Sequence, residues 1–359
     1  MPREWLIQHR AGTLAEWEAA EASGPALLAG ERAYVTDLKL DVVGDGVTKV
    51  AGLGAVGSGT YAPIAGDGYD DLGYDVFVLL GQSNMVGYGT TISLTYSDPT
   101  HPDVWRWVAS GSGVGALASH KSKITLASDP LGHPDTLTGV GPGMEFARQY
   151  VRGLKASRRV LLVPVAVQAT PLVTATPPTW NSTVTGSLLD NAIDYANAAI
   201  AAAGNNARLK GFLWVQGETD AQMSVTGSAY QVALDALIAK LRAQVTGASA
   251  TTPFVIGSMV PSYSTGTTAA VNAAQAGTPS RVANTAYAVG PTGSGNVHYT
   301  EAEQRTLGAS LLTAYRAALT STLVPAVPGA PTGLTAAAAN AQVVLGWSAP
   351  TVGYPAVTD

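Results

Sequence analysis

The sequence predicts an α/β fold in which helices cover both faces of a parallel sheet. Short apolar runs, typical of strands buried on both faces, alternate with longer segments whose apolar residues recur at helical spacing. The candidate strands are 75–80, 159–167, 209–215, 253–257 and 285–289. The candidate helices cover 147–154, 189–203, 230–245 and 307–318, and Thr300 with Glu303 forms a capping box before the last one.

The amino-acid composition excludes several classes of protein function. A chain of 359 residues with 46% hydrophobic and 13% charged residues predicts two or three packed domains. A net charge of -5 without a basic cluster argues against a nucleic-acid partner. The absence of cysteine excludes disulfides, thiol catalysis and thiolate metal sites. No apolar run is long enough for a membrane span, and the first residues lack a signal-peptide core, so we expect synthesis in a cytoplasm.

Changes in composition divide the chain into five parts. We expect an N-terminal structural module at 1–65, a linker at 66–74, the α/β domain at 75–320, a Pro/Ala linker at 321–331 and a β-rich segment at 332–359. Within the α/β domain, residues 86–140 are interpreted as a long irregular insertion, which is typical of a functional or flexible loop.

Ser83 is the candidate nucleophile. It follows the apolar run 76–80 directly after Gly81, on the turn at the C-terminal end of a buried strand. Open parallel sheets place their ligand sites at those ends, and a serine on a rigid turn is suited to nucleophilic attack. The alternative is an ordinary strand followed by an ordinary turn.

Three further stretches support a site at this edge. The glycine-rich stretch 139–147 opens a helix and offers backbone N–H groups to an anion. The stretch 214–220 carries Gln216, Glu218 and Asp220 past the end of another strand, and His298 stands just before the last helix, where it is a candidate general base. Each stretch alone is also compatible with a structural turn or helix cap.

Together these four stretches resemble the SGNH hydrolases, and more specifically the sialate O-acetylesterase branch, carbohydrate esterase family six. That branch reads G-Q-S-N-M, G-V-G-P-G-M-x-F-A, W-x-Q-G-E-[ST]-D and D-G-x-H, and a weaker match is P-x-A-x-G-G-T at 164–170. The resemblance implies a three-layer α/β/α (flavodoxin-like) fold and a serine esterase that needs no cofactor and no metal. It implies Ser83 as nucleophile and His298 as general base.

The same resemblance implies an oxyanion hole. Its donors would be the N–H groups of Ser83 and of Gly141 or Gly143, with the Gln216 side chain as a further candidate. Gln82 and Asn84, which flank the serine in the motif, are expected to bind substrate as well.

The chain departs from the family at one position. The family has Asp three residues before the histidine, where this chain has Gly295. Glu218, Asp220 or a backbone carbonyl are the alternatives for orienting His298, and loss of a triad acid lowers turnover by up to about 10⁴-fold.

The two ends of the chain carry separate resemblances. Residues 7–48 resemble the N-terminal segment of phage tail-fibre and minor tail proteins, a structural and often trimeric module in which Trp17, Asp45 and Gly46 would hold the fold. Residues 328–359 resemble the start of a fibronectin type III domain with Trp347 as its core tryptophan. These resemblances imply a virion location, other tail proteins as partners and a homotrimer.

The function expected from the sequence is removal of O-acetyl groups from a bacterial surface glycan, with Trp105, Trp107 and Trp180 as candidates for stacking on sugar rings. Two alternatives stay open at this point. One is a glycan-binding adhesin that has lost turnover, and the other is an esterase for lipids or other acyl groups.

Overall fold

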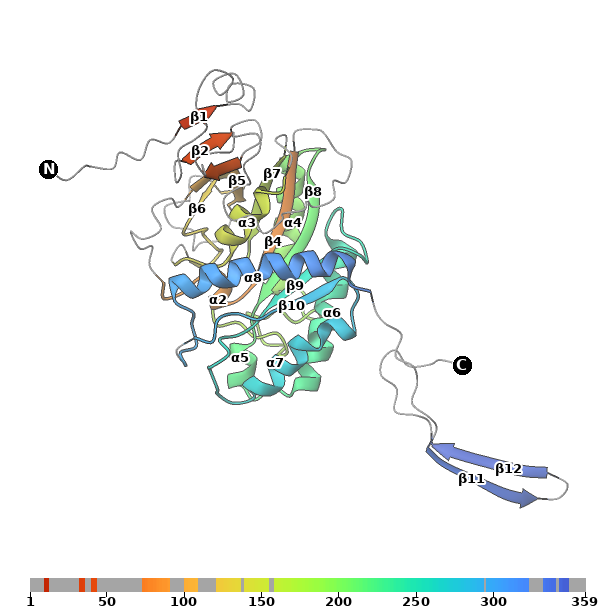
Figure 1. Ribbon diagram of the computed structural model, residues 1–359. Helices are drawn as coiled ribbons and strands as arrows, with labels where there is room; N and C mark the ends of the chain where they lie inside the picture. Colours follow the sequence, from red (N-terminus) through yellow and green to blue (C-terminus); the bar gives the residue numbers. More distant parts are fainter. Residues whose placement is uncertain are drawn as a thin grey trace.

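A seven-stranded sheet forms the centre of the molecule (Figure 1). The computed structural model describes residues 10–12, 32–35, 40–43, 73–90, 100–108, 121–136, 139–154, 158–293, 295–322, 332–339 and 342–348. The strand order is β10-β9-β8-β4-β7-β5-β6, so β4 lies in the middle, and every neighbouring pair is parallel except β5 with β6. The strands are β4 (Gly73–Gly81), β5 (Thr100–Trp107), β6 (Ile124–Ser128), β7 (Arg158–Pro164), β8 (Arg208–Val215), β9 (Phe254–Gly257) and β10 (Thr285–Ala288).

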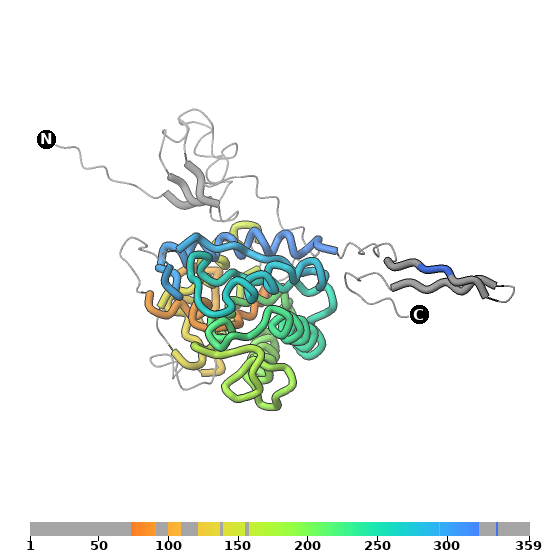
Figure 2. The backbone as a smooth tube through the Cα atoms, turned by 90° about the horizontal axis from the view of Figure 1, so that it is seen from below, coloured from red at the N-terminus to blue at the C-terminus, as the bar shows by residue number. Residues whose placement is uncertain are grey.

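The central strand buries side chains on both of its faces. Val76, Val78 and Leu80 pack with α4, α6 and α7, while Phe77 and Leu79 pack with α3 and α8 on the other face. Figure 2 shows α8 on one side of the sheet and α4 on the opposite side. The helices are α2 (Ser83–Val86), α3 (Gly143–Val151), α4 (Leu188–Ala203), α5 (Glu218–Gln222), α6 (Gly227–Gln244), α7 (Thr268–Ala276) and α8 (Glu301–Thr320), with a 3-10 turn at Thr278–Ser280.

These layers confirm the predicted α/β/α architecture, since all five expected strands and all four expected helices are present. The capping box is also confirmed, because the Thr300 side chain accepts from Glu303 N and the Glu303 carboxylate accepts from Thr300 N. β4 begins at Gly73, inside the segment 66–74 that was predicted to be a linker.

The interpretation of 86–140 as an irregular insertion is wrong in part. This segment supplies β5 and β6, which extend the sheet beyond β7, and β6 makes the sheet mixed because it runs antiparallel to β5. Val104, Trp107 and Ala127 from these strands are buried in the core. The strand signal is short and is interrupted by polar residues, which is why periodicity did not reveal it.

Two small sheets lie outside the α/β core. β1 (Arg10–Gly12), β2 (Arg32–Val35) and β3 (Leu40–Val43) form one, and β11 (Thr332–Ala339) pairs antiparallel with β12 (Gln342–Ser348) in the other. The expected helix at 14–22 and the positions Trp17, Asp45 and Gly46 lie outside the described residues. The phage-tail and fibronectin resemblances therefore stay predictions.

The described helices include none that combines the length and the apolar character needed to cross a membrane.

A buried ion pair anchors the start of β4. The Asp75 carboxylate accepts from Arg158 Nε on β7 at 2.8 Å and from the Tyr150 hydroxyl on α3 at 2.7 Å. Both side chains of the ion pair are less than 5% exposed. One carboxylate thus ties two strands to the helix beside them.

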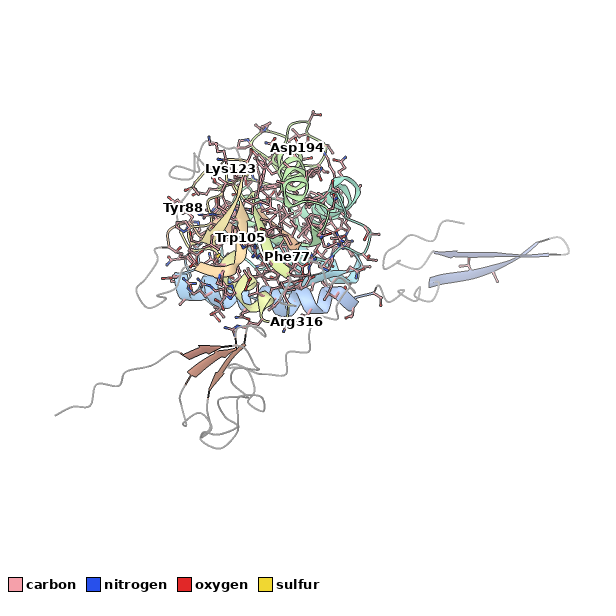
Figure 3. The ribbon with its side chains drawn as sticks, turned by 90° about the horizontal axis from the view of Figure 1, so that it is seen from above. Phe77, Tyr88, Trp105, Lys123, Asp194 and Arg316 are labelled. Carbon is pink, nitrogen blue, oxygen red and sulfur yellow. The ribbon has the colours of Figure 1, made fainter. Side chains whose placement is uncertain are left out.

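Asp75→Ala should lower the free energy of unfolding in urea by about 3–5 kcal/mol, because it leaves the Arg158 guanidinium buried without its counter-charge. Asp194→Ala is the matched control, since Asp194 is exposed on α4 (Figure 3) and its loss should change stability by no more than about 0.5 kcal/mol. Equal effects of the two substitutions would contradict the anchoring role.

Candidate active site

Ser83 lies on a turn that is pressed against the end of the neighbouring strand β8. Gly81 has a φ of 125°, and a Cβ built there would fall 2.0 Å from the Val215 carbonyl oxygen, so only glycine fits. Gln82 N donates to the same carbonyl at 2.9 Å. Ser83 then begins α2 and is 5% exposed. The turn is therefore rigid, and it places the hydroxyl at the C-terminal edge of the sheet.

Gln82 has a structural contact in this turn. Its side-chain oxygen accepts from Thr219 N at 3.3 Å and more weakly from Gly217 N at 3.5 Å. The side chain is buried at 2% exposure and ties the serine turn to the start of α5. Gln82 thus helps to shape the site without facing a substrate.

His298 meets Ser83 from the other side of the site. Its Nε2 atom lies 3.0 Å from Ser83 Oγ, although the two residues are 215 positions apart in the sequence. The imidazole is half-buried, and this burial lowers its pKa from 6.5. The Tyr88 ring lies edge-on to it with a centroid distance of 5.2 Å. A neutral imidazole at hydrogen-bond distance from a serine hydroxyl has the geometry of a base and its nucleophile.

Asn84 connects these two residues. Its side-chain amide donates to Glu218 Oε1 and to the Val297 carbonyl, and its oxygen accepts from Tyr299 N at 3.1 Å. Val297 and Tyr299 flank His298, so one fully buried amide next to the serine holds the histidine loop from both sides. Asn84 was expected to bind substrate; the structure makes it a positioning residue.

Glu218 lies beneath Asn84 and makes no recorded contact with His298. Burial raises the pKa of this carboxyl to about 7, against the opposing effect of the Asn84 hydrogen bond. Because the folded-state pKa is raised, protonation stabilises the fold fully below the ordinary value of 4.5 and loses that effect as the pH rises through about 7. Glu218 acts on the histidine only through Asn84.

Asp220 and Gln216 belong to a different hydrogen-bond network. The Asp220 carboxylate accepts from Leu172 N at 2.8 Å and from Val173 N at 2.9 Å. Gln216 Nε2 donates to Asp220 and to the Thr170 carbonyl, so both of its protons are engaged. The expectations that Asp220 orients His298 and that Gln216 donates to an oxyanion are therefore wrong. Both residues hold the loop after β7.

Gly141 and Gly143 lie behind the serine turn. A Cβ at Gly141 would fall 2.3 Å from the Met85 carbonyl oxygen, and one at Gly143 would meet the Leu79 and Leu131 side chains. Both glycines are buried, and their close packing against α2 and the core supports the turn. This packing does not decide where their N–H groups point, so their expected role as oxyanion donors stays a prediction.

The sequence analysis did not identify Ala169 as a candidate site residue. Val167 N donates to Gly81 O at 3.0 Å, so the chain after β7 continues beside the end of β4 up to two residues before Ala169. Ala169 is exposed and has a φ of 51°, which is uncommon for a residue with a Cβ. Its N–H has no acceptor among the described residues. The sequence signal that could have identified it is the weak match to P-x-A-x-G-G-T beginning at Pro164, in which Ala169 stands in place of the second glycine.

Two side chains hold this segment in place. Ala166 N donates to His133 Nδ1 at 3.0 Å, and Gln168 N donates to Asp135 Oδ2 at 2.8 Å. His133 is fully buried, and burial lowers its pKa to about 3, so it stays neutral and able to accept that hydrogen bond. The loop that carries Ala169 is thereby fixed from its outer side.

The three tryptophans do not lie where sugar stacking requires. Trp180 and Trp107 are buried in the core beneath the sheet, at 0% and 4% exposure. Trp105 is half-buried in the middle of β5 and packs under the Arg159 guanidinium, 5.4 Å from its ring centroid (Figure 3). The stacking hypothesis is therefore wrong for Trp107 and Trp180, and Trp105 already has a partner.

Among the residues that the structure describes, no group of three or more His, Asp or Glu side chains is arranged to hold a metal ion.

Residues 73–317 match the model of a family described as carbohydrate esterase, sialic acid-specific acetylesterase. The chain belongs to this family. It is thus a hydrolase of the carbohydrate and sialate acetylesterase type. Among curated proteins no significant match was found.

Two solved structures share the fold, and a third aligns with a lower TM-score. A protein from Arabidopsis thaliana aligns with a TM-score of 0.54 and 24% identity over 68% of this chain and 98% of its own. NanS aligns with a TM-score of 0.54 and 16% identity over 69% and 98%. XAC1771, a carbohydrate acetylesterase from Xanthomonas citri, aligns with a TM-score of 0.47 and 16% identity over 77% and 62%.

Asn84→Ala should lower kcat for p-nitrophenyl acetate by about 10²-fold with little change in KM, because small displacements of a catalytic group are costly. Thermal unfolding measured on the same sample checks that the fold survives. A variant that keeps the wild-type kcat would contradict the role of Asn84 in holding the His298 loop.

Proposed function

We propose that this chain hydrolyses O-acetyl esters of carbohydrates, with Ser83 as the nucleophile and His298 as the general base. The observation that carries the proposal is the 3.0 Å distance between His298 Nε2 and Ser83 Oγ at the C-terminal edge of the sheet. Membership of the carbohydrate esterase family supports the reaction class.

The reaction follows from this geometry. Ser83 Oγ attacks the acetyl carbonyl carbon while His298 Nε2 accepts the hydroxyl proton. The tetrahedral intermediate collapses, His298 returns the proton to the departing sugar oxygen, and an acetyl-serine remains. Water then attacks this ester with His298 again as base, which releases acetate and regenerates Ser83.

The oxyanion is assigned to two backbone N–H groups. Ser83 N is the first amide of α2 and lacks an intrahelical acceptor, and the N–H of Ala169, on the segment after β7, has no acceptor among the described residues. Each preorganised donor of this kind is worth about 3–4 kcal/mol of transition-state stabilisation. Both donors sit on segments that the protein holds rigidly, which is what preorganisation requires.

The proposed substrate is an O-acetylated glycan on a bacterial surface, and the proposed setting is a phage tail. The family supports the glycan. The tail location, the partner tail proteins and the homotrimer rest on the resemblance of the N-terminal segment alone.

Ser83→Ala and His298→Ala should each reduce hydrolysis of p-nitrophenyl acetate by about 10³-fold or more, because neither half of the pair works alone. Initial rates of the intact chain and both variants measure this. A series from acetate to octanoate on the wild type serves as the specificity control, and rates that rise with chain length would exclude an acetylesterase.

One alternative is a glycan-binding protein without turnover, and the observation that favours it is Gly295 in place of an acid. A wild-type rate equal to that of Ser83→Ala, together with retained binding to an acetylated glycan, would establish this alternative.

On the acid side of the pH profile, kcat/KM should fall to half of its maximum at a pH below 6.5. Burial lowers the pKa of His298, so the imidazole stays neutral and active as a base to lower pH than a free histidine would. Rates of p-nitrophenyl acetate hydrolysis between pH 5 and pH 8 measure this.

Glu218→Gln is the control for that profile, because Glu218 titrates near pH 7 and glutamine keeps the acceptor that Asn84 uses. Its acid limb should coincide with that of the wild type. A half-maximal rate at or above pH 6.5 in both proteins would contradict the assignment.

A further inference from the structure

Only one of the two ring nitrogens of His298 has a partner among the described residues. Nε2 faces Ser83 Oγ, whereas Nδ1 has no hydrogen-bond acceptor among the residues that the structure describes. A general base of this type normally donates Nδ1–H to a carboxylate, which selects the productive tautomer and stabilises the imidazolium that forms during reaction. None of the residues that the structure describes supplies such a carboxylate to His298.

The carboxylates nearest in sequence and structure are engaged elsewhere. Glu218 is bonded to Asn84, and Asp220 accepts from the loop after β7. Glu303 closes the capping box of α8, and Glu301 pairs with Arg305. Burial lowers the pKa of His298, and no carboxylate of the described residues shifts it in the opposite direction.

The space beside Nδ1 is open. A Cβ built on Gly89 would have one neighbour within 4 Å, which is His298 Nδ1 itself at 4.0 Å. A Cβ built on Gly295 would meet nothing within 4 Å. Both glycines are exposed, and Tyr88, labelled at the periphery in Figure 3, is 45% exposed beside them. The described residues therefore leave room for a small group beside Nδ1.

We propose that the space beside Gly89 at His298 Nδ1 is a binding site for a carboxylate that completes the catalytic triad from outside the chain. The proposal rests on the proposed esterase function. The carboxylate comes from the solution or from the substrate, as in an acetylated sugar acid. Nδ1–H provides the directional hydrogen bond that holds it.

The chemistry balances without a further reactant. The carboxylate stays ionised and accepts the hydrogen bond from Nδ1–H while Nε2 takes the proton of Ser83 and the Oγ–carbon bond forms. It stabilises the positive charge that appears on the imidazolium and is released unchanged when the proton moves to the leaving oxygen. The effect is on kcat, since the charge develops only during reaction.

The first test uses sodium formate as the probe and p-nitrophenyl acetate, a neutral ester, as the substrate. For the wild type we expect formate to raise kcat saturably by about tenfold or more, because a triad acid contributes up to about 10⁴-fold. Sodium chloride at equal ionic strength is the control and should have no such effect. Formate should also move the acid limb of the pH profile upward, because a bound anion favours the imidazolium.

Matched variants at Gly89 locate the site. Gly89→Asp places a carboxylate beside Nδ1, so it should raise kcat without formate and remove the response to formate. Gly89→Asn has the same size and the same backbone strain at a φ of 79°, so it should remove the response without the rise. If both variants respond to formate as the wild type does, the carboxylate does not bind beside Gly89.

The second test separates the two sources of the carboxylate. An O-acetylated sialic acid is compared with its methyl ester, with acetate release measured in the absence of formate. A kcat about tenfold higher for the free acid, lost in Gly89→Asn, assigns the carboxylate to the substrate. Equal values together with a response to formate assign it to the solution.

Wild-type activity that responds neither to formate nor to the substrate carboxylate would overturn the proposal. That outcome is distinct from failure of the esterase function, which is judged by whether hydrolysis of p-nitrophenyl acetate without formate depends on Ser83.

Discussion

The catalytic arrangement depends on the hydrogen bonds of one buried amide, that of Asn84. This side chain follows the nucleophile in sequence and holds the loop on both sides of His298, more than 200 residues further along the chain. Burying this amide without hydrogen bonds would cost several kcal/mol of folding free energy. The network is therefore stable only when the serine turn, α5 and the histidine loop are all in place. The Glu218 carboxyl beneath it completes the set of partners.

The scaffold makes that arrangement possible by pressing backbone against backbone. Gly81 approaches the end of β8 so closely that no side chain fits, and Gly141 approaches Met85 in the same way. These contacts hold the nucleophile turn between two rigid segments. The glycines at these positions thus serve packing here, and we assign the oxyanion to the N–H groups of Ser83 and Ala169, which have no acceptor among the described residues.

The site is also unusual in what it leaves open. His298 is desolvated enough to lower its pKa, yet the described residues place the exposed Gly89 and no acid beside its Nδ1. The loss of the acid at position 295 removes an anchor for the imidazole, and the Asn84 hydrogen bonds supply positional order without supplying charge. Orientation and charge stabilisation, which one aspartate normally provides together, are therefore separated in this chain.

The sequence alone determined the α/β/α layers, the nucleophile and the histidine, because continuous apolar strands and compact motifs report on local structure and on what ends each strand. Only the tertiary structure decided the roles of the polar residues around them. Gln216 and Asp220 stand in the motif beside Glu218, yet their hydrogen bonds run to the loop after β7. The positive φ of Ala169 has only a weak sequence signal, the motif glycine that it replaces, and the antiparallel strand β6 is visible only once β5 provides its partner. Side-chain partners far apart in the chain are set by packing, which no local pattern contains.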